Sequence, residues 1–254
     1  MSASLKDVVV AANWEASERV VAFTTTRQGG VSQLGYDSFN QATHVGDEAK
    51  AVSENRRRLQ QLVGGTPDFQ WLDQVHGVDV HRARNVIEPP RADALVTDQV
   101  NLACCVLTAD CLPVFFASKE GDEVAIAHAG WRGLAAGIIE STIAKMRTPA
   151  KNLIAYLGPA IGPCHFEVGS DVVDAFGYKP ATSVFSRCFS PVFGTGNTAK
   201  YLANLPELAA LKLEQLDVSV TRSQLCTVCE EGSLYSFRRT PVTGRMANVI
   251  YIRS

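Results

Sequence analysis

The stretch 107–134, LTADCLPVFFASKEGDEVAIAHAGWRGL, decides how the centre of this chain folds. Its apolar segments PVFFA and EVAIA flank the charged turn SKEGD, a pattern typical of an antiparallel β-hairpin. Pairing outward from that turn predicts that Cys111 and His128 lie opposite each other. Opposed side chains have Cβ atoms about 4.5–5.5 Å apart, so this thiolate and imidazole could share a metal ion or exchange a proton.

The segments on either side of the hairpin bring further polar groups to this pair. AGWRG and the amphipathic segment 134–146 follow His128, which predicts a helix whose first backbone N–H groups, together with Arg132, form an anion site. Asp110 immediately precedes Cys111. A carboxylate at that place could orient an imidazole or a water molecule.

A second histidine comes from WLDQVHGVDVH at 71–81. On a strand over 74–81, His76 shares one face with Val78 and Val80 and points inward, whereas His81 points toward solvent. Two histidines and one cysteine satisfy catalytic zinc, which prefers three protein ligands and an open position, and they also suit copper. Spacing alone leaves the structural alternative open, because a buried free cysteine is most often a small hydrophobic residue.

The remaining cysteine and histidine motifs give weaker signals. Cys226 and Cys229 form CTVC, but a single CxxC without a second pair is weak support for a structural zinc site. We interpret it as a thiol pair near the pocket or the surface. His44 is expected in a loop, and His165 in the turn after GPAIGP.

Length and composition restrict the class of protein. The chain has 254 residues, a net charge of −2 and well-mixed charges, which favours a small-molecule substrate over nucleic acid or an anionic membrane. The N-terminal segment has no signal-peptide pattern and no segment reaches 18 uninterrupted apolar residues, so a cytoplasmic protein is expected. Seven cysteines, two of them adjacent in an apolar strand, indicate reduced thiols. No repeat or linker divides the chain, so we expect one domain over 1–254, while its oligomeric state is left open.

Hydrophobic periodicity predicts the elements of this domain. Strand-like segments cover 20–25, 74–81, 102–108, 113–117, 123–128, 152–157, 218–221 and 248–252. Helical patterns cover 47–63, 134–146, 171–176 and 206–216. Because strands and helices do not alternate regularly, the order favours an α+β fold of mixed β-sheets flanked by helices over a simple doubly wound sheet.

Several longer motifs follow one another along the chain. They are FTTTRQGGVSQLGYDSFN with HVGD and ENRRRL, QVHG (74–77), ADALVTD (92–98), LTADCLPV (107–114), AHAGWRGLAAG (127–137), LGPAIGPCHFEVG (157–169) and YSFRRTPVTGRMA (235–247). This ordered series resembles the YfiH family, also called the laccase-domain or multicopper polyphenol oxidase family. The resemblance covers nearly the whole chain, and the combination of TADC with HAGWRG is highly specific.

The resemblance implies an α/β/β/α sandwich and a zinc site formed by His76, Cys111 and His128. It also implies phosphorolysis of adenosine, inosine and methylthioadenosine, adenosine deamination, polyphenol oxidation, or removal of wrong amino acids from peptidoglycan precursors. In one departure, Phe237 stands in SFRR where the family motif is SYRR. A multicopper oxidase mechanism fits worst, because five histidines in the whole chain cannot supply its copper sites.

Purine chemistry suits the predicted site best. A zinc ion can lower the pKa of water to about 7 for attack at C6 of adenine, with Cys111, His128 and Asp110 as catalytic residues and Asp110 as a proton carrier. Phosphorolysis instead needs an anion-binding group. The candidate phosphate ligands are Arg27, Arg132, Arg238 and Arg239.

Two alternatives belong to other classes. In a metal-independent cysteine hydrolase acting on an amide, Cys111 would be the nucleophile and His128 its base. Such a pair does not need His76, which a three-ligand metal site does. A catalytically silent scaffold would leave the cysteine and both histidines without a role. The sequence therefore predicts a metal-dependent purine nucleoside enzyme.

Overall fold

The computed structural model describes residues 8–84, 86–179, 182–192 and 199–254, and within these residues the strands form three sheets. In order across the sheet, the six-stranded one contains β13 (Ser219–Arg222), β9 (Leu153–Leu157), β7 (Leu112–Ser118), β8 (Val124–Ala129), β5 (Ala94–Thr97) and β4 (Val80–Arg82). The five-stranded one contains β1 (Val9–Ala11), β2 (Val20–Thr25), β14 (Met246–Ile252), β6 (Leu102–Thr108) and β3 (Asp68–Gln70). The third contains β10 (Glu167–Gly169), β12 (Lys200–Ala203) and β11 (Phe189–Val192).

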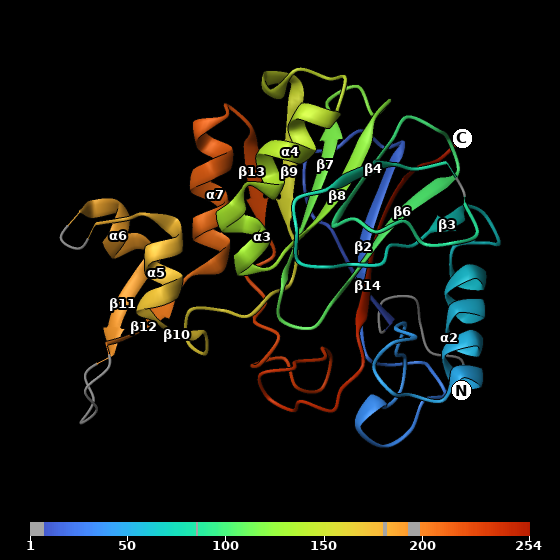
Figure 1. The fold of residues 1–254 in the computed structure, drawn as a ribbon. Helices are drawn as coiled ribbons and strands as arrows, with labels where there is room; N and C mark the ends of the chain where they lie inside the picture. Colours follow the sequence, from blue (N-terminus) through green and yellow to red (C-terminus); the bar gives the residue numbers. More distant parts are fainter. Residues whose placement is uncertain (1–7, 85, 180–181, 193–198) are drawn as a thin grey trace.

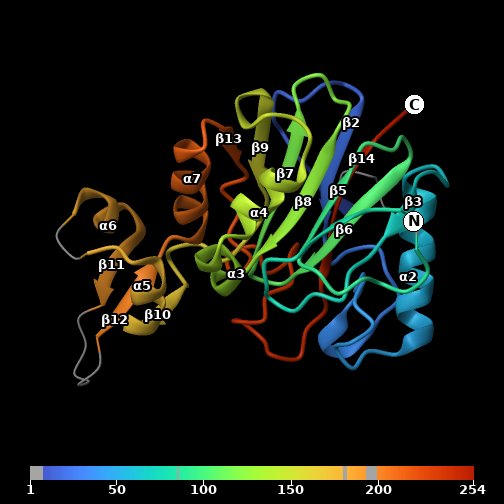
Figure 2. The same ribbon diagram turned by 45° about the horizontal axis from the view of Figure 1, so that its top comes forward.

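The two larger sheets pack face to face between helices (Figures 1 and 2). Helices α3 (Trp131–Ala136), α4 (Ile138–Lys145) and α7 (Leu205–Gln215) cover the six-stranded sheet. Helix α2 (Ala49–Leu62) covers the five-stranded sheet. This arrangement confirms the expected α+β fold with α/β/β/α layers. Helices α5 (Ser170–Phe176) and α6 (Ser183–Cys188) and the third sheet form a small lobe beside α3 and α7, and two 3-10 turns span Leu34–Tyr36 and Ala150–Asn152.

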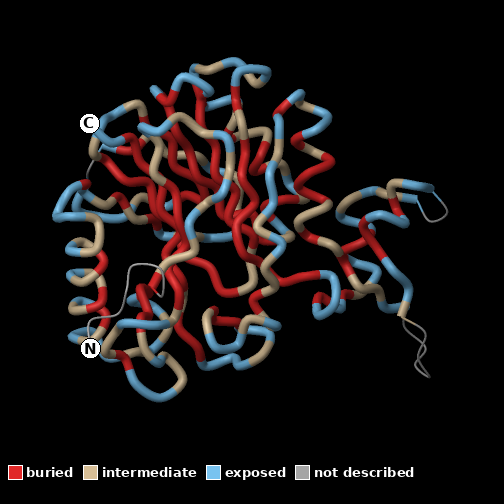
Figure 3. The backbone as a smooth tube through the Cα atoms, turned by 180° about the vertical axis from the view of Figure 1, so that it is seen from behind, coloured by how far each residue is buried: buried red, intermediate tan, exposed pale blue. Residues whose placement is uncertain are grey.

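Strand β7 shows why the central segments are almost entirely apolar. Leu112, Val114 and Phe116 face the helices, whereas Phe115 and Ala117 face the second sheet, because successive side chains alternate between the two faces. All seven residues of β7 are buried, and Figure 3 shows the central strands in red, the colour of buried residues. Burying each phenylalanine side chain contributes about 1.5–3 kcal/mol to stability, so this strand is a central part of the hydrophobic core.

Two predicted elements are wrong. Strand 74–81 is reduced to β4, because the chain turns at His76, which has a left-handed φ of 60°, and only Val80–Arg82 pairs with β5. Helix 134–146 begins earlier, at Trp131, and is divided at Gly137, whose φ of 105° ends α3 and precedes α4. Several short strands and α6 lacked a signal in the periodicity.

Among the described residues no helix combines the length and the apolar composition that a membrane span requires. The expectation drawn from the N-terminal segment falls partly on residues 1–7, which lie outside the described residues. The single domain over 1–254 stays a prediction.

Candidate functional site

Three predicted metal ligands, His76, Cys111 and His128, lie together at one end of the six-stranded sheet. One ligand atom of each lies within 4.8 Å of the other two. The Cys111 Sγ and His76 Nε2 atoms are 3.9 Å apart, and the two imidazole ring centres are 4.7 Å apart. Tetrahedral zinc, with Zn–S about 2.3 Å and Zn–N about 2.0–2.1 Å, would set an S···N distance of about 3.6 Å. The donor types and their spacing therefore fit a zinc ion.

The hairpin brings Cys111 to His128 in a different register from the predicted one. A hydrogen bond from the Ser118 N–H to the Glu123 carbonyl closes the turn, so Pro113 pairs with His128 and Cys111 lies opposite Gly130. The direct pairing of Cys111 with His128 was therefore wrong by two residues. Because side chains alternate with a period of two, both still lie on one face of the sheet.

Gly130 makes room for this diagonal approach. A Cβ atom there would lie 3.0 Å from the Cys111 Sγ atom and 3.2 Å from His76 Cδ2. Contacts this close force a neighbouring atom to move. The glycine between the hairpin and α3 therefore lets the thiol and the His76 ring approach each other.

Asp93, directly before β5, holds both histidines. Its fully buried carboxylate accepts a hydrogen bond from the His128 ring at Nδ1, over 2.8 Å, and others from the backbone N–H groups of Val75, His76 and Gly77, over 2.7–3.2 Å. Since Nδ1 of His128 is bonded to Asp93, its Nε2 is the atom free to face the cavity. Burial opposes ionisation, but the His128 ring and these N–H groups lower the pKa of Asp93.

Asp110 does not orient an imidazole, contrary to the expectation for it. Its two carboxylate oxygens accept hydrogen bonds from the Thr227 hydroxyl and the Arg238 backbone N–H, both over 2.6 Å. The left-handed φ of 94° at Asp110 turns this carboxylate toward the loop that contains those two residues. Asp110 therefore holds a wall of the cavity, and Asp93 is the partner of His128.

The electrostatics of the site favour an ionised thiol. Burial raises the pKa of Cys111, but the neighbouring His128 and His76 rings outweigh it, and the pKa of the thiol is lowered. Burial lowers the pKa of His128, but the Cys111 thiolate and the Asp93 carboxylate raise it by more. The pKa of this ring is therefore raised overall. Without a metal ion, the site therefore holds a thiolate next to a protonated imidazole.

A cavity of about 440 Å³ opens in front of the three ligands. Three guanidinium groups line it, those of Arg132, Arg238 and Arg245, against one carboxylate, that of Asp110. Arg238 and Arg245 donate to backbone carbonyls, and Arg132 lies over the Trp131 ring. In the described part of the chain none of the three forms an ion pair with a carboxylate, so their charge is available to an anion.

Aromatic side chains form another part of the cavity lining. Trp131, Phe166 and Phe237 border it, and Phe237 is 52% exposed although it is large and apolar. A planar base could stack on such a ring. His44 also lines the cavity, where burial and then Arg245 lower the pKa of its ring, so this imidazole is neutral near pH 7.

Two predicted phosphate ligands lie outside this cavity lining. Arg27 donates to the carbonyls of Asp37 and Glu231, and Arg239 donates to those of Thr227, Val228 and Leu234. Both guanidinium groups therefore hold loops together, and these contacts give no support to the prediction that they bind phosphate.

Three residues of the site had not been given a role from the sequence: Asp93, Arg245 and His44. Asp93 offered a signal, since an acidic residue directly before the apolar run ALVT needs a buried partner. Arg245 and His44 offered none, because their loops reach the cavity only through the tertiary fold.

Comparisons with known proteins place the chain in a family. The chain is 42% identical over 242 residues to a purine nucleoside phosphorylase of Pseudomonas aeruginosa, covering 95% of this chain and 97% of the relative. It is 41% identical over 249 residues to the purine nucleoside phosphorylase YfiH of Escherichia coli, covering 96% and 98%. The crystal structure of a Neisseria meningitidis protein matches with a TM-score of 0.89 and 45% identity over 97% of this chain and 99% of that chain. A family model described as multi-copper polyphenol oxidoreductase laccase matches residues 21–253, and the chain belongs to this family.

Proposed function

We propose that the protein is a zinc-dependent purine nucleoside phosphorylase. Its substrates would be adenosine, inosine and methylthioadenosine, and its products the free base and the (methylthio)ribose 1-phosphate. The names of the relatives support this reaction class. The observation that carries the proposal is one cavity that combines three candidate metal ligands, three arginines that form no ion pair with any described carboxylate, and an exposed aromatic ring.

The arginines and the aromatic ring would contact different parts of the substrates. Arg132, Arg238 and Arg245 would bind phosphate and hold one of its oxygens toward C1′ of the ribose. As that oxygen bonds to C1′, the bond from C1′ to the purine nitrogen breaks and its electron pair leaves with the base. Phe237 would stack on the purine and orient it.

His76, Cys111 and His128 would hold the zinc ion, and Asp93 would keep the His128 ring in place through Nδ1. When bound, zinc supplies a Lewis acid that stabilises negative charge on the substrate. Copper is the alternative metal for the same donors. Deamination of adenosine would be a second reaction in this cavity, with water adding at C6 and ammonia leaving.

Product analysis tests the proposal. Protein of known metal content is incubated with adenosine, with and without phosphate, beside the variants His76→Ala and Arg132→Gln. We expect phosphate-dependent adenine and ribose 1-phosphate, lost together with the metal in His76→Ala. Arg132→Gln should keep the metal and raise the KM for phosphate about tenfold or more, the effect of a lost charge-assisted contact. Arg27→Gln is the matched control, since Arg27 lies outside the cavity lining and should leave that KM unchanged. The absence of any phosphate-dependent product would refute the proposal.

A cysteine hydrolase is the second candidate. The arrangement of Cys111, His128 and Asp93 favours it. The lowered pKa of the Cys111 thiol suits a nucleophile, the His128 imidazole suits its base, and the Asp93 carboxylate that bonds this imidazole would orient it. Its substrate would be an amide, as editing of peptidoglycan precursors requires. Release of an amino acid from such a precursor by His76→Ala, without purine products from the wild type, would establish this reading instead.

A further inference from the structure

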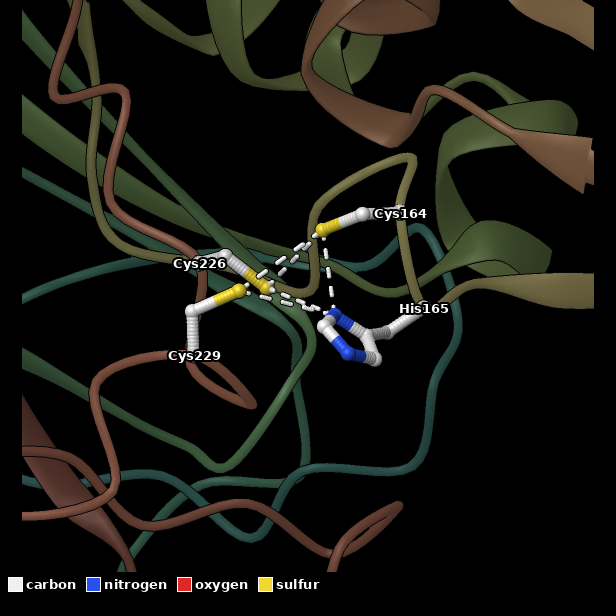
Figure 4. A group of neighbouring side chains, drawn as sticks. All are labelled: Cys164, His165, Cys226 and Cys229. Carbon is white, nitrogen blue, oxygen red and sulfur yellow. Dashed lines mark hydrogen bonds between the residues drawn. The ribbon is translucent and has the colours of Figure 1, made fainter.

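Four potential metal ligands meet on loops outside the active-site cavity. Cys164 and His165 belong to the loop between β9 and β10, and Cys226 and Cys229 to the loop after β13. Figure 4 shows the three sulfur atoms and the His165 ring pointing toward one another from the two loops. One donor atom of each residue lies within 4.8 Å of all the others. CTVC therefore has the second ligand pair that the sequence alone did not provide.

The separations of these atoms are those of a tetrahedral site. The Cys164 Sγ atom lies 3.9 Å from Cys226 Sγ and 3.7 Å from Cys229 Sγ, and the His165 Nδ1 atom lies 3.7 and 3.6 Å from the same two sulfurs. A tetrahedral zinc ion with its usual bond lengths sets S···S to about 3.8 Å and S···N to about 3.6 Å. Of these five separations, the one between Cys164 Sγ and His165 Nδ1, 3.0 Å, would have to open.

The backbone of the two loops already holds this geometry. Residues Ala160 and Cys226 form a β-bridge, with hydrogen bonds from the Ala160 N–H to Leu225 and from the Thr227 N–H to Ala160. The Gly162 N–H donates to the Cys226 sulfur over 3.2 Å, a contact that stabilises a thiolate ligand. A Cβ atom on Gly162 would lie 3.0 Å from the Cys226 Cβ and 3.2 Å from its sulfur.

We propose that Cys164, His165, Cys226 and Cys229 bind a structural zinc ion. Three thiolates and one imidazole form a Cys₃His set, which fills all four positions of tetrahedral zinc and leaves none for substrate. In this respect the site differs from the three-ligand site at His76, which keeps one position open. The two sites together give the chain one structural and one reactive metal position.

The bound ion would fix one wall of the active-site cavity. Thr227, inside the CTVC loop, donates to the Asp110 carboxylate, and the Arg238 guanidinium donates to the carbonyl of His165 over 3.2 Å. Both Asp110 and Arg238 line the cavity. Zinc that joins the two loops therefore holds the backbone to which Arg238 is bonded.

Metal analysis of purified full-length protein tests this site independently of any activity. After preparation under reducing conditions with zinc, we expect two zinc ions per chain in the wild type and one in Cys226→Ser/Cys229→Ser. His76→Ala should lose the other ion, and a variant combining all three substitutions should hold none. Cys188→Ala is the matched control, because Cys188 is a free cysteine outside both groups and its loss should leave two ions. The melting temperature of the double variant should fall by about 5–10 °C, corresponding to about 2–3 kcal/mol for a chain of this size.

A spectroscopic measurement covers the case in which the double variant does not fold. Cobalt(II) is bound to metal-free wild type and to His76→Ala, and the thiolate-to-cobalt charge-transfer band is recorded. We expect His76→Ala to keep most of this band, since three of the four thiolate ligands belong to the Cys₃His site, together with the visible bands of tetrahedral cobalt. A wild type with one zinc ion that His76→Ala removes entirely would overturn the proposal. So would a disulfide between Cys226 and Cys229 that persists under reducing conditions in the presence of zinc.

Discussion

Asp93 is the residue whose carboxylate would position the histidines of the proposed zinc site, and Asp93→Asn tests this. The change keeps the size of the side chain but removes its charge and one acceptor oxygen. If the amide oxygen faces His128 and the His76 N–H, the new NH₂ group faces the N–H groups of Val75 and Gly77. These two donors are then left without an acceptor in a site where Asp93 is fully buried.

Two effects follow from this geometry. Loss of a partner that orients a metal-bound histidine lowers metal affinity by about 10–100-fold, equivalent to about 1.4–2.8 kcal/mol. Each unpaired backbone N–H group costs about 1–3 kcal/mol of folding stability. We therefore expect Asp93→Asn to bind zinc at least tenfold more weakly and to unfold at lower denaturant concentration.

The assay is competition for zinc against a chromophoric chelator, with the Cys226→Ser/Cys229→Ser background used to isolate the three-ligand site. Asp110→Asn is the matched control, since Asp110 adjoins Cys111 but bonds to Thr227 and the Arg238 backbone instead of to a histidine. It should change zinc affinity by a smaller factor than Asp93→Asn. Wild-type affinity in Asp93→Asn, or a larger loss in Asp110→Asn, would show that our reasoning about the histidine partner is incorrect.

Three further outcomes are expected. Burial lowers the pKa of His128, but the Cys111 thiolate and Asp93 raise it more, so zinc that binds near pH 7 must displace the proton of this ring. In chelator competition, the apparent affinity of the protein for zinc should therefore fall about tenfold for each pH unit of acidification. A zinc affinity that does not change with pH would contradict this. Gly130→Ala places a Cβ atom 3.0 Å from the Cys111 sulfur, so metal analysis should show zinc lost from this site while circular dichroism shows the fold retained. Phe237→Ala removes the exposed ring, and steady-state kinetics should show the KM for nucleoside raised about fivefold or more at unchanged zinc content, since base stacking contributes about 1–3 kcal/mol.

Local sequence was sufficient for most of the long strands of the two larger sheets. Segments 20–25 and 102–108 match β2 and β6, and the apolar runs around SKEGD became β7 and β8. These strands are largely buried on both faces, so most of their side chains are apolar. A short strand such as β10 or β12 has no such run, and its pairing depends on residues distant in the chain.

The approach of Cys111 to His128 was also readable from the sequence, because both flank one hairpin and alternation keeps them on one face even after a shift of two residues. The register of the hairpin could not be predicted from the sequence, since the register depends on a backbone hydrogen bond within the turn. His76 was assigned as a ligand on a strand that does not exist there. Its left-handed backbone and the hydrogen bond from its backbone N–H to Asp93 bring the ring to the site instead.

The sequence by itself determined the layered sheets, the family motifs and the identity of the three candidate ligands, because each is recorded in local periodicity or in a short motif. Only the tertiary structure decided which carboxylate supports His128, which arginines reach the cavity and which residues complete CTVC. Asp93 and His128 are 35 residues apart, and Cys164 and Cys226 are 62 apart. Contacts at such separations depend on how sheets and loops pack, and local periodicity carries no information about that packing.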